Sequence, residues 1–102
     1  MSFRLARAAL DDLESIDDYT VKKWGVEQSD TYLAMLWATF ERIAQTPSRW
    51  RLRPELHPEC RVCFAGSHAI FYCIRGDSIE VARVLHGTMD FSRHTDALFD
   101  DS

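Results

Sequence analysis

The stretch that decides the fold covers residues 66–77 and reads Gly-Ser-His-Ala-Ile-Phe-Tyr-Cys-Ile-Arg-Gly-Asp. It is one apolar run between two turn pairs, Gly66-Ser67 and Gly76-Asp77, in which glycine supplies the positive φ that a two-residue hairpin needs. Each turn must join this run to another strand. The sequence therefore predicts three consecutive strands joined by tight turns: Cys60 to Ala65, His68 to Arg75 and Ser78 to His86.

The middle strand has a second property, because it is apolar at both odd and even positions. A strand exposed on one face alternates apolar and polar residues, whereas a strand covered on both faces does not. We therefore expect a cover on each side of the sheet. One is a helical hairpin, and the other is the C-terminal segment or a partner chain.

The residues upstream of the strands predict that hairpin. Residues 2–7 alternate as a short first strand, and from Ala8 the apolar positions recur every three or four residues as in an amphipathic helix. Gly25 ends this helix at a C′ position. A second helix is predicted from Val26 to Gln45, since the residue before Pro47 is pushed out of the α region. The apolar stripes of the two helices are Leu10, Leu13, Ile16, Tyr19 and Trp24, then Leu33, Leu36, Trp37, Phe40 and Ile43.

Length and charge limit the classes of fold and function that this chain can have. A chain of 102 residues forms one domain, residues 1–102, and its order of elements is β-α-α-β-β-β, an α+β class. It has neither an apolar run of membrane-spanning length nor a secretory signal, so we expect a cytoplasmic protein. The net charge of −4 argues against a general nucleic-acid binder.

Three cysteines raise the question of a metal site. Cys60 and Cys63 lie three residues apart on a strand, so their side chains point to opposite faces and cannot share one ion. We therefore expect Cys60, Cys63 and Cys73 to be buried, reduced thiols, and we expect neither a metal nor a cofactor.

Trp50 lies among Arg49, Arg51 and Arg53 in a loop that contains prolines. Interleaved basic and aromatic residues are typical of nucleic-acid contacts. In a loop, however, arginine stems more often cover a sheet edge while their charges stay in water. The second interpretation is favoured.

A further cluster follows the last strand. Arg83 alternates with Val81 and Leu85, so it lies on an apolar face and needs an anionic partner in the chain or outside it. An internal carboxylate is the commoner case, and Asp90 is one candidate. His86 and His94 are candidates for a general base, or only for hydrogen-bond partners. The neighbouring carboxylates Asp11 and Asp12 are interpreted as solvating an exposed helix face.

These elements together resemble the ParE branch of the RelE/ParE toxins. The run Arg83-Val84-Leu85-His86, with Met89-Asp90 and Arg93-His94 after it, is similar to the end of ParE-type toxins. The strand Gly66-Ser67-His68-Ala69-Ile70-Phe71-Tyr72 resembles the family's G-x-H-x-I-F-Y strand. Matches to both helices extend the likeness over nearly the whole chain; they are Ala9, Asp12, Leu13, Ile16, Tyr19, Trp24 and Gly25, then Tyr32, Leu36, Phe40, Ile43, Ala44 and Pro47.

The resemblance implies a helical hairpin packed on a twisted antiparallel sheet. It also implies a cytosolic toxin that blocks DNA gyrase, with no cofactor and no turnover. Its partner would be a ParD-like antitoxin, a ribbon-helix-helix protein whose arm folds on the toxin. The toxin would reach operator DNA only through this antitoxin. The residues expected to contact the target are Arg83, His86, Met89, Asp90, Arg93 and His94. Those expected to contact the antitoxin are Leu13, Tyr19, Trp24, Leu33, Trp37 and Trp50.

Two alternatives share the same fold. A RelE-like ribosome-dependent mRNA endonuclease would use Arg61, Arg83 and His86 in catalysis. An inactive member would bind the antitoxin and nothing else. The acidic net charge and the absence of lysine after Lys23 favour gyrase over the ribosome, because a protein that docks on RNA is expected to be basic.

Overall fold

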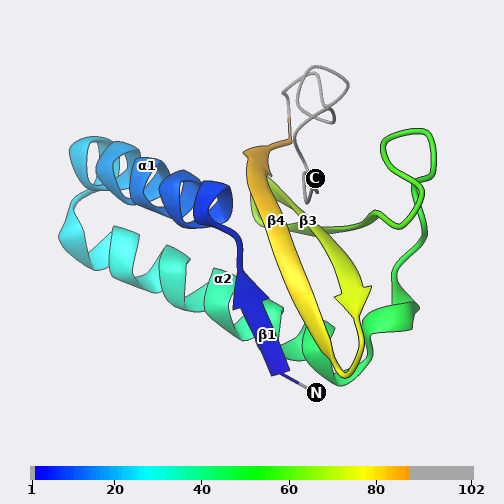
Figure 1. The fold of residues 1–102 in the computed structure, drawn as a ribbon. Coiled ribbons are helices and arrows are strands. Elements are labelled where there is room, and N and C mark those ends of the chain that lie inside the picture. The colour runs from blue at the N-terminus through cyan, green and yellow to red at the C-terminus, as the bar shows by residue number, and fades with distance from the viewer. Residues whose placement is uncertain (1, 88–102) are drawn as a thin grey trace.

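The computed structural model describes residues 2–87 of the chain and shows a helical hairpin beside a sheet (Figure 1). Its elements in order are β1 (Ser2–Leu5), α1 (Arg7–Trp24), α2 (Val26–Gln45), the 3-10 turn η1 (Pro47–Arg49), β2 (Arg61–Ala65), β3 (His68–Arg75) and β4 (Ser78–His86). The predicted α+β class, element order and hairpin turns are confirmed. No helix within residues 2–87 has both the length and the hydropathy needed to cross a bilayer.

The strand order in the described sheet is β1-β4-β3-β2. β2, β3 and β4 are antiparallel to their neighbours, but β1 runs parallel to β4. The sheet is therefore mixed, and the expectation of an antiparallel sheet holds only for the last three strands. β1 and β4 are joined through both helices and the other two strands, and a connection of that length permits parallel pairing.

β4 contains one extra residue. Phe71 of β3 pairs with Arg83, whereas the next residue, Tyr72, pairs with Val81, so Ala82 is left over as a β-bulge. Because side chains alternate along a strand, the extra residue changes which face each later residue occupies. Val81 packs in the cluster under the helices, while Leu85 packs in the cluster on the other face. The predicted shared face of Val81, Arg83 and Leu85 is therefore wrong.

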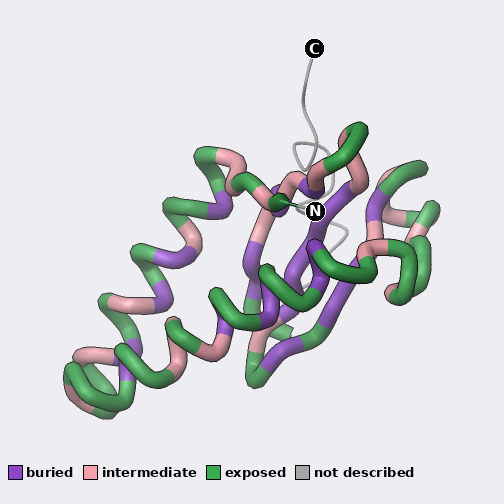
Figure 2. Tube along the Cα trace, turned by 90° about the horizontal axis from the view of Figure 1, so that it is seen from below, coloured by how far each residue is buried: buried purple, intermediate pink, exposed green. Residues whose placement is uncertain are grey.

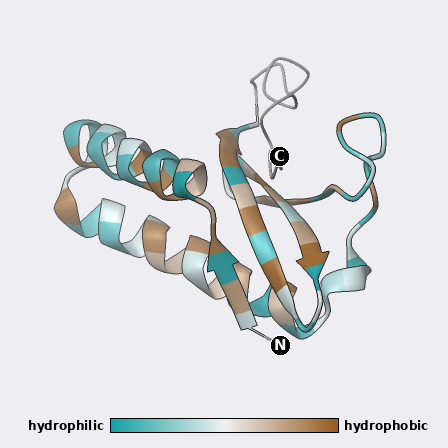
Figure 3. Cartoon of the chain, viewed as in Figure 1, coloured by the Kyte–Doolittle hydropathy of each residue, from teal (hydrophilic) through white to brown (hydrophobic). Residues whose placement is uncertain are grey.

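The strands of the sheet are largely buried (Figure 2) and carry hydrophobic residues along their length (Figure 3). Each face of the sheet has its own apolar cluster. The larger cluster lies between the helices and the sheet and includes Leu36, Phe40 and Tyr72. The smaller cluster lies on the opposite face; its members are Cys60, Val62, Ala69, Phe71, Cys73, Ala82 and Leu85, with Leu56 packed against them. The prediction that β3 is buried on both faces is confirmed. The C-terminal segment, one of the two predicted covers, lies outside the described residues.

The buried stripe of α1 differs from the predicted one. Ala9, Leu13, Ile16 and Thr20 are buried, whereas Leu10, Tyr19 and Trp24 are exposed. The hairpin extends beyond the sheet at its Trp24 end (Figure 1), so the last turns of α1 have no strand beneath them. The buried hydroxyl of Thr20 is satisfied, since it donates to the carbonyl of Ile16, 2.7 Å away.

The turn between β2 and β3 joins the sheet to α2. Gly66 has φ +57°, as the two-residue turn requires, and a Cβ at this position would lie 2.8 Å from the hydroxyl oxygen of Tyr32. That hydroxyl oxygen accepts the N–H of Ser67 at 3.0 Å. Close approach and backbone conformation both require glycine here.

We predict that Gly66→Ala lowers the free energy of unfolding by about 2 kcal/mol or more, because the new Cβ adds a clash with Tyr32 to the strain of positive φ. Gly76→Ala is the matched control: its φ is +62°, and a Cβ there would meet nothing within 4 Å. The control should lose only the backbone contribution, about 1 kcal/mol. Urea denaturation of both variants measures the difference, and equal losses would contradict the role of Tyr32.

Candidate functional site

A groove lies between the hairpin and the end of β4. Its volume is about 580 Å³. Its lining residues come from α1, α2, the β2–β3 turn, the start of β3 and the end of β4. The lining residues are Asp12, Ser15, Ile16, Tyr19, Thr20, Lys23, Trp24, Gln28, Tyr32, Ser67, His68, Arg83, Val84, Leu85 and His86.

An ion pair between α1 and β4 forms part of the lining of the groove. Arg83 donates from Nε to Oδ2 of Asp12 at 2.7 Å and from Nη2 to Oδ1 at 2.8 Å. Oδ2 also accepts the backbone N–H of Val84 at 2.9 Å. These bonds raise the pKa of Arg83, the main cause being the hydrogen bond to Asp12.

One prediction about this pair is corrected, and the other falls outside the described residues. The sequence predicts Asp12 on an exposed, solvating face, but its side chain is only 13% exposed. Asp90, the predicted partner of Arg83, lies outside the described residues, and within them the carboxylate bound to Arg83 is that of Asp12. The general expectation of an internal carboxylate is confirmed.

A hydrogen-bonded cluster of Tyr32, Ser67 and His68 lies beside the ion pair. The hydroxyl of Tyr32 lies 2.6 Å from Nδ1 of His68 and accepts the Ser67 N–H. Since the hydroxyl accepts from Ser67, its proton is free to be donated to Nδ1, an arrangement that requires neutral His68. Burial lowers the pKa of His68, and His86, whose ring centroid is 5.4 Å away, lowers it further.

The outer end of the groove carries exposed aromatic side chains. Tyr19 and Trp24 are 61% and 64% exposed. Nζ of Lys23 donates to the Tyr19 hydroxyl at 3.1 Å and lies over both rings, 5.5 and 5.6 Å from their centroids. A cation held between two rings fixes their orientation without covering their outer faces.

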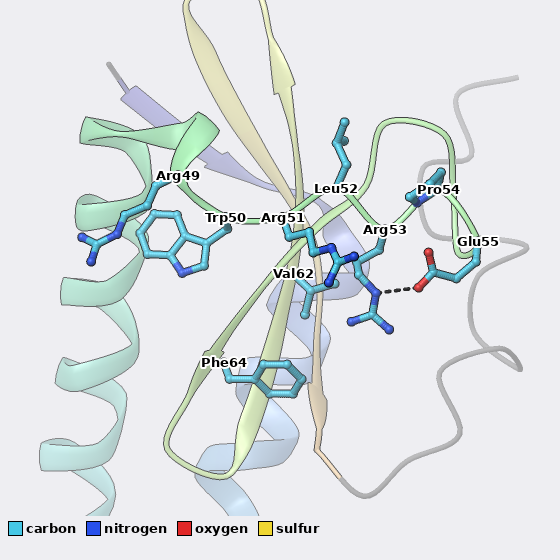
Figure 4. A pocket seen from close by; sticks show the side chains of 9 residues that line it. All are labelled: Arg49, Trp50, Arg51, Leu52, Arg53, Pro54, Glu55, Val62 and Phe64. Atoms are coloured by element: carbon cyan, nitrogen blue, oxygen red, sulfur yellow. Dashed lines mark hydrogen bonds and ion pairs between the residues drawn. The ribbon is translucent and has the colours of Figure 1, made fainter.

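A second pocket, of about 660 Å³, lies at the other edge of the sheet (Figure 4). It shares no lining residue with the groove and is formed by Arg49, Trp50, Arg51, Leu52, Arg53, Pro54, Glu55, Val62 and Phe64. Here Arg53 pairs with Glu55 at 2.6 Å, and the guanidinium of Arg49 lies 5.5 Å from the centroid of the Trp50 ring.

The cysteines behave as predicted within the described residues. All three are buried and free. Cys60 and Cys63 belong to clusters on opposite faces of the sheet. Burial raises the pKa of Cys60 to about 12, so its thiol stays protonated and is a poor nucleophile. No group of three or more metal-binding side chains gathers anywhere in residues 2–87.

The residues expected to contact an antitoxin are distributed over several surfaces. Tyr19 and Trp24 line the groove, and Trp50 lines the second pocket. Leu33 packs against the core, and Trp37 contacts the rings of Phe3 and Phe40. Leu13 is only 8% exposed and offers little surface to a partner.

The residues expected to contact the target are described only in part. Arg83 and His86 line the groove, whereas Met89, Asp90, Arg93 and His94 lie outside the described residues, as does the candidate base His94.

The residues proposed for catalysis in an endonuclease do not converge. Arg61 donates to the carbonyls of Trp50 at 2.6 Å and Ser48 at 3.4 Å, in the loop after α2. Arg61 begins β2 and Ala65 ends it; Ala65 pairs with His68, which in turn pairs with His86. Four residues of strand therefore separate Arg61 from the level of His86 in the sheet, a distance of about 13 Å.

Sequence reasoning from residue chemistry missed Asp12, Tyr32 and His68 as parts of the groove. All three stand in the segments that carry the family resemblance, which gave them no role. The signal for Asp12 was Arg83 itself, a cation on an apolar strand, but no sequence rule ranks Asp12 above the other carboxylates of α1.

Comparison with known proteins finds a matching family and similar toxins. The family described as the ParE toxin of the type II toxin–antitoxin system parDE matches residues 3–91. The chain is 40% identical over 92 residues to Toxin ParE1 of Caulobacter vibrioides and 41% identical over 93 residues to Toxin ParE1 of Mycobacterium tuberculosis. Each alignment covers 90% of this chain and 95% of the relative.

A solved structure shares the fold. It belongs to the chromosomal ParDE toxin–antitoxin system of P. aeruginosa, with a TM-score of 0.73 and 22% identity over 84% of this chain and 95% of that one. The RelE/ParE-like fold expected from the resemblance is confirmed. Because the family match spans most of the chain and two relatives share about two-fifths of their residues with it, the chain belongs to the ParE toxin family of type II toxin–antitoxin systems.

Proposed function

We propose that this toxin is held inactive by a ParD-like antitoxin whose arm lies in the groove, and that the free toxin inhibits DNA gyrase. The antitoxin would be a ribbon-helix-helix protein that alone carries the operator-DNA contacts. The observation that carries the antitoxin part is the groove itself, with Tyr19 and Trp24 exposed along one side. Large exposed aromatic side chains that border a groove mark protein-binding surfaces.

The charge of the groove supports a peptide segment as its occupant. Asp12 already neutralises Arg83, and the lining offers apolar area from Ile16, Trp24 and Leu85. An amphipathic segment could bury its apolar side chains against these residues. Its polar side chains would meet hydrogen-bonding groups such as Tyr32 and Gln28 at the margin.

The contacts that Arg61 and Arg83 already make favour gyrase inhibition over RNA cleavage. A nuclease needs free cationic groups to stabilise charge on the reacting phosphate. Arg83 already makes two hydrogen bonds to a carboxylate, and Arg61 already donates to two backbone carbonyls. Neither is available without breaking contacts that support the fold.

The proposed target-binding segment starts at the end of β4. Asp12 anchors Arg83 and Val84, and His86 lies close beyond them beside His68. The segment therefore begins next to residues that the hydrogen bonds of Asp12 hold in place. We propose that Arg83 and His86 orient it and that Met89, Asp90, Arg93 and His94 reach the target.

We predict that the purified chain blocks supercoiling by purified gyrase and leaves mRNA uncut in a ribosome-coupled translation reaction. The substitution Arg93→Gln with His94→Gln should abolish the block, because it removes the two basic groups proposed to face gyrase. Codon-dependent mRNA cuts with unaffected supercoiling would contradict the gyrase proposal and favour the endonuclease. Inactivity in both assays, with no growth arrest on expression, would leave an antitoxin-binding module.

We predict that Trp24→Ala weakens binding of the antitoxin encoded beside this chain by tenfold or more, on the order expected for a central aromatic contact. Leu10→Ala is the matched control, since Leu10 is an exposed apolar residue of the same helix outside the groove. Isothermal titration calorimetry measures both. Equal affinity of Trp24→Ala and the control would exclude the groove as the antitoxin site.

A further inference from the structure

We propose that the open edge of β2, with the arginine pocket beside it, binds an extended peptide segment in which carboxylates alternate with apolar side chains. This surface lies at the opposite edge of the sheet from β1, and the pocket shares no residue with the groove. The inference therefore does not rest on the antitoxin or gyrase proposals.

β2 is an edge strand with backbone groups available to a partner. The two-residue turn after Ala65 makes Ala65 and His68 the closing hydrogen-bonded pair, so the bonded pairs continue at Cys63 and Arg61. The peptide groups of Val62 and Phe64 consequently point away from β3. Leu52 pairs with Arg61 and covers the start of this edge. In residues 2–87 no strand pairs with the edge at Phe64.

Among residues 2–87, the carbonyl of Phe64 has only a weak donor. The Sγ of Cys63 lies 3.8 Å from it, and a thiol is a poor hydrogen-bond donor. The Phe64 side chain is 59% exposed. An added strand would supply a backbone N–H to this carbonyl and cover part of the ring.

The arginines beside this edge are only partly neutralised within residues 2–87. Arg53 pairs with Glu55, but neither Arg49 nor Arg51 has a carboxylate within 4.0 Å there. Arg49 belongs to the 3-10 turn η1, whereas Arg51 and Arg53 follow in the loop that pairs with the start of β2. The pocket lining therefore carries three arginines and one glutamate, an excess of positive charge that the carboxylates of a peptide would complement.

The lining favours a peptide over a nucleic acid. Leu52, Pro54, Val62 and Phe64 give the pocket an apolar part, which suits the apolar side chains of such a peptide. An exposed strand edge offers hydrogen bonds to a peptide backbone, which a nucleic acid cannot return in the same pattern. The chain as a whole is acidic, with net charge −4, so phosphate contacts would act against its overall field.

The test uses the full chain and a fluorescein-labelled peptide of alternating Asp and Val, followed by fluorescence anisotropy. We expect saturable binding that Arg51→Gln weakens by about tenfold, the loss of one charge-assisted contact. Arg7→Gln is the matched control: Arg7 is an exposed arginine on α1 that pairs with Asp11 and does not line the pocket. It should bind the peptide as the parent chain does.

Two modified peptides test the two proposed kinds of contact separately. A peptide with Lys in place of Asp tests the charge, and one with N-methyl groups on alternate amides tests the strand pairing; both should bind at least tenfold more weakly. Tighter binding of single-stranded oligothymidine than of the acidic peptide would overturn the proposal in favour of a nucleic acid. Absence of saturable peptide binding, or unchanged binding by Arg51→Gln, would overturn it outright. Supercoiling inhibition by Arg51→Gln should remain, so a failure here is distinct from a failure of the gyrase proposal.

Discussion

The carboxylate of Asp12 holds the first helix to the last strand. β1 ends at Leu5, opposite Val81, and the chain turns into α1 with the N–H of Ala6 donating to the carbonyl of Val81 at 2.9 Å. Beyond this point the outer edge of β4 loses its strand neighbour. Asp12 takes over by accepting the N–H of Val84, and it neutralises Arg83 with its two oxygens. One side chain thus satisfies a buried backbone donor and a cation that apolar surroundings could not hold alone.

The groove follows from this attachment. With α1 fixed to β4 at Asp12, the later turns of the helix extend past the sheet, and Tyr19 and Trp24 remain exposed where they line the groove. Tyr32 connects α2 to the β2–β3 turn through Ser67 and to the start of β3 through His68. The two links hold both sides of the groove, and the end of β4 lies between them. A change at Asp12 should therefore affect the groove and the start of the proposed target-binding segment together.

Much of the fold was predictable because local rules and the tertiary structure agree. The second helix begins and ends at the predicted residues, and Gly66 and Gly76 have the positive φ that their turns require. The errors arise where a contact between distant segments decides the outcome. Ala82 is an extra residue in β4 that alternation cannot reveal, and it separated Val81 from Leu85. Asp12 and Arg83 are 71 residues apart, so nothing local distinguishes Asp12 from Asp11 beside it. Tyr19 and Trp24 continue the helical period of α1, but the sheet does not extend to meet them.

A double-mutant cycle of Asp12→Ala and Arg83→Met, with free energies of unfolding from urea denaturation, measures the strength of this link. We predict a coupling energy of about 2 kcal/mol for this largely buried, bidentate pair. We also predict that Asp12→Ala still costs about 1 kcal/mol in the Arg83→Met background, because the N–H of Val84 then loses its acceptor. A coupling energy near zero, with no cost of Asp12→Ala in that background, would contradict the role of Asp12 as the link between the helical hairpin and the sheet.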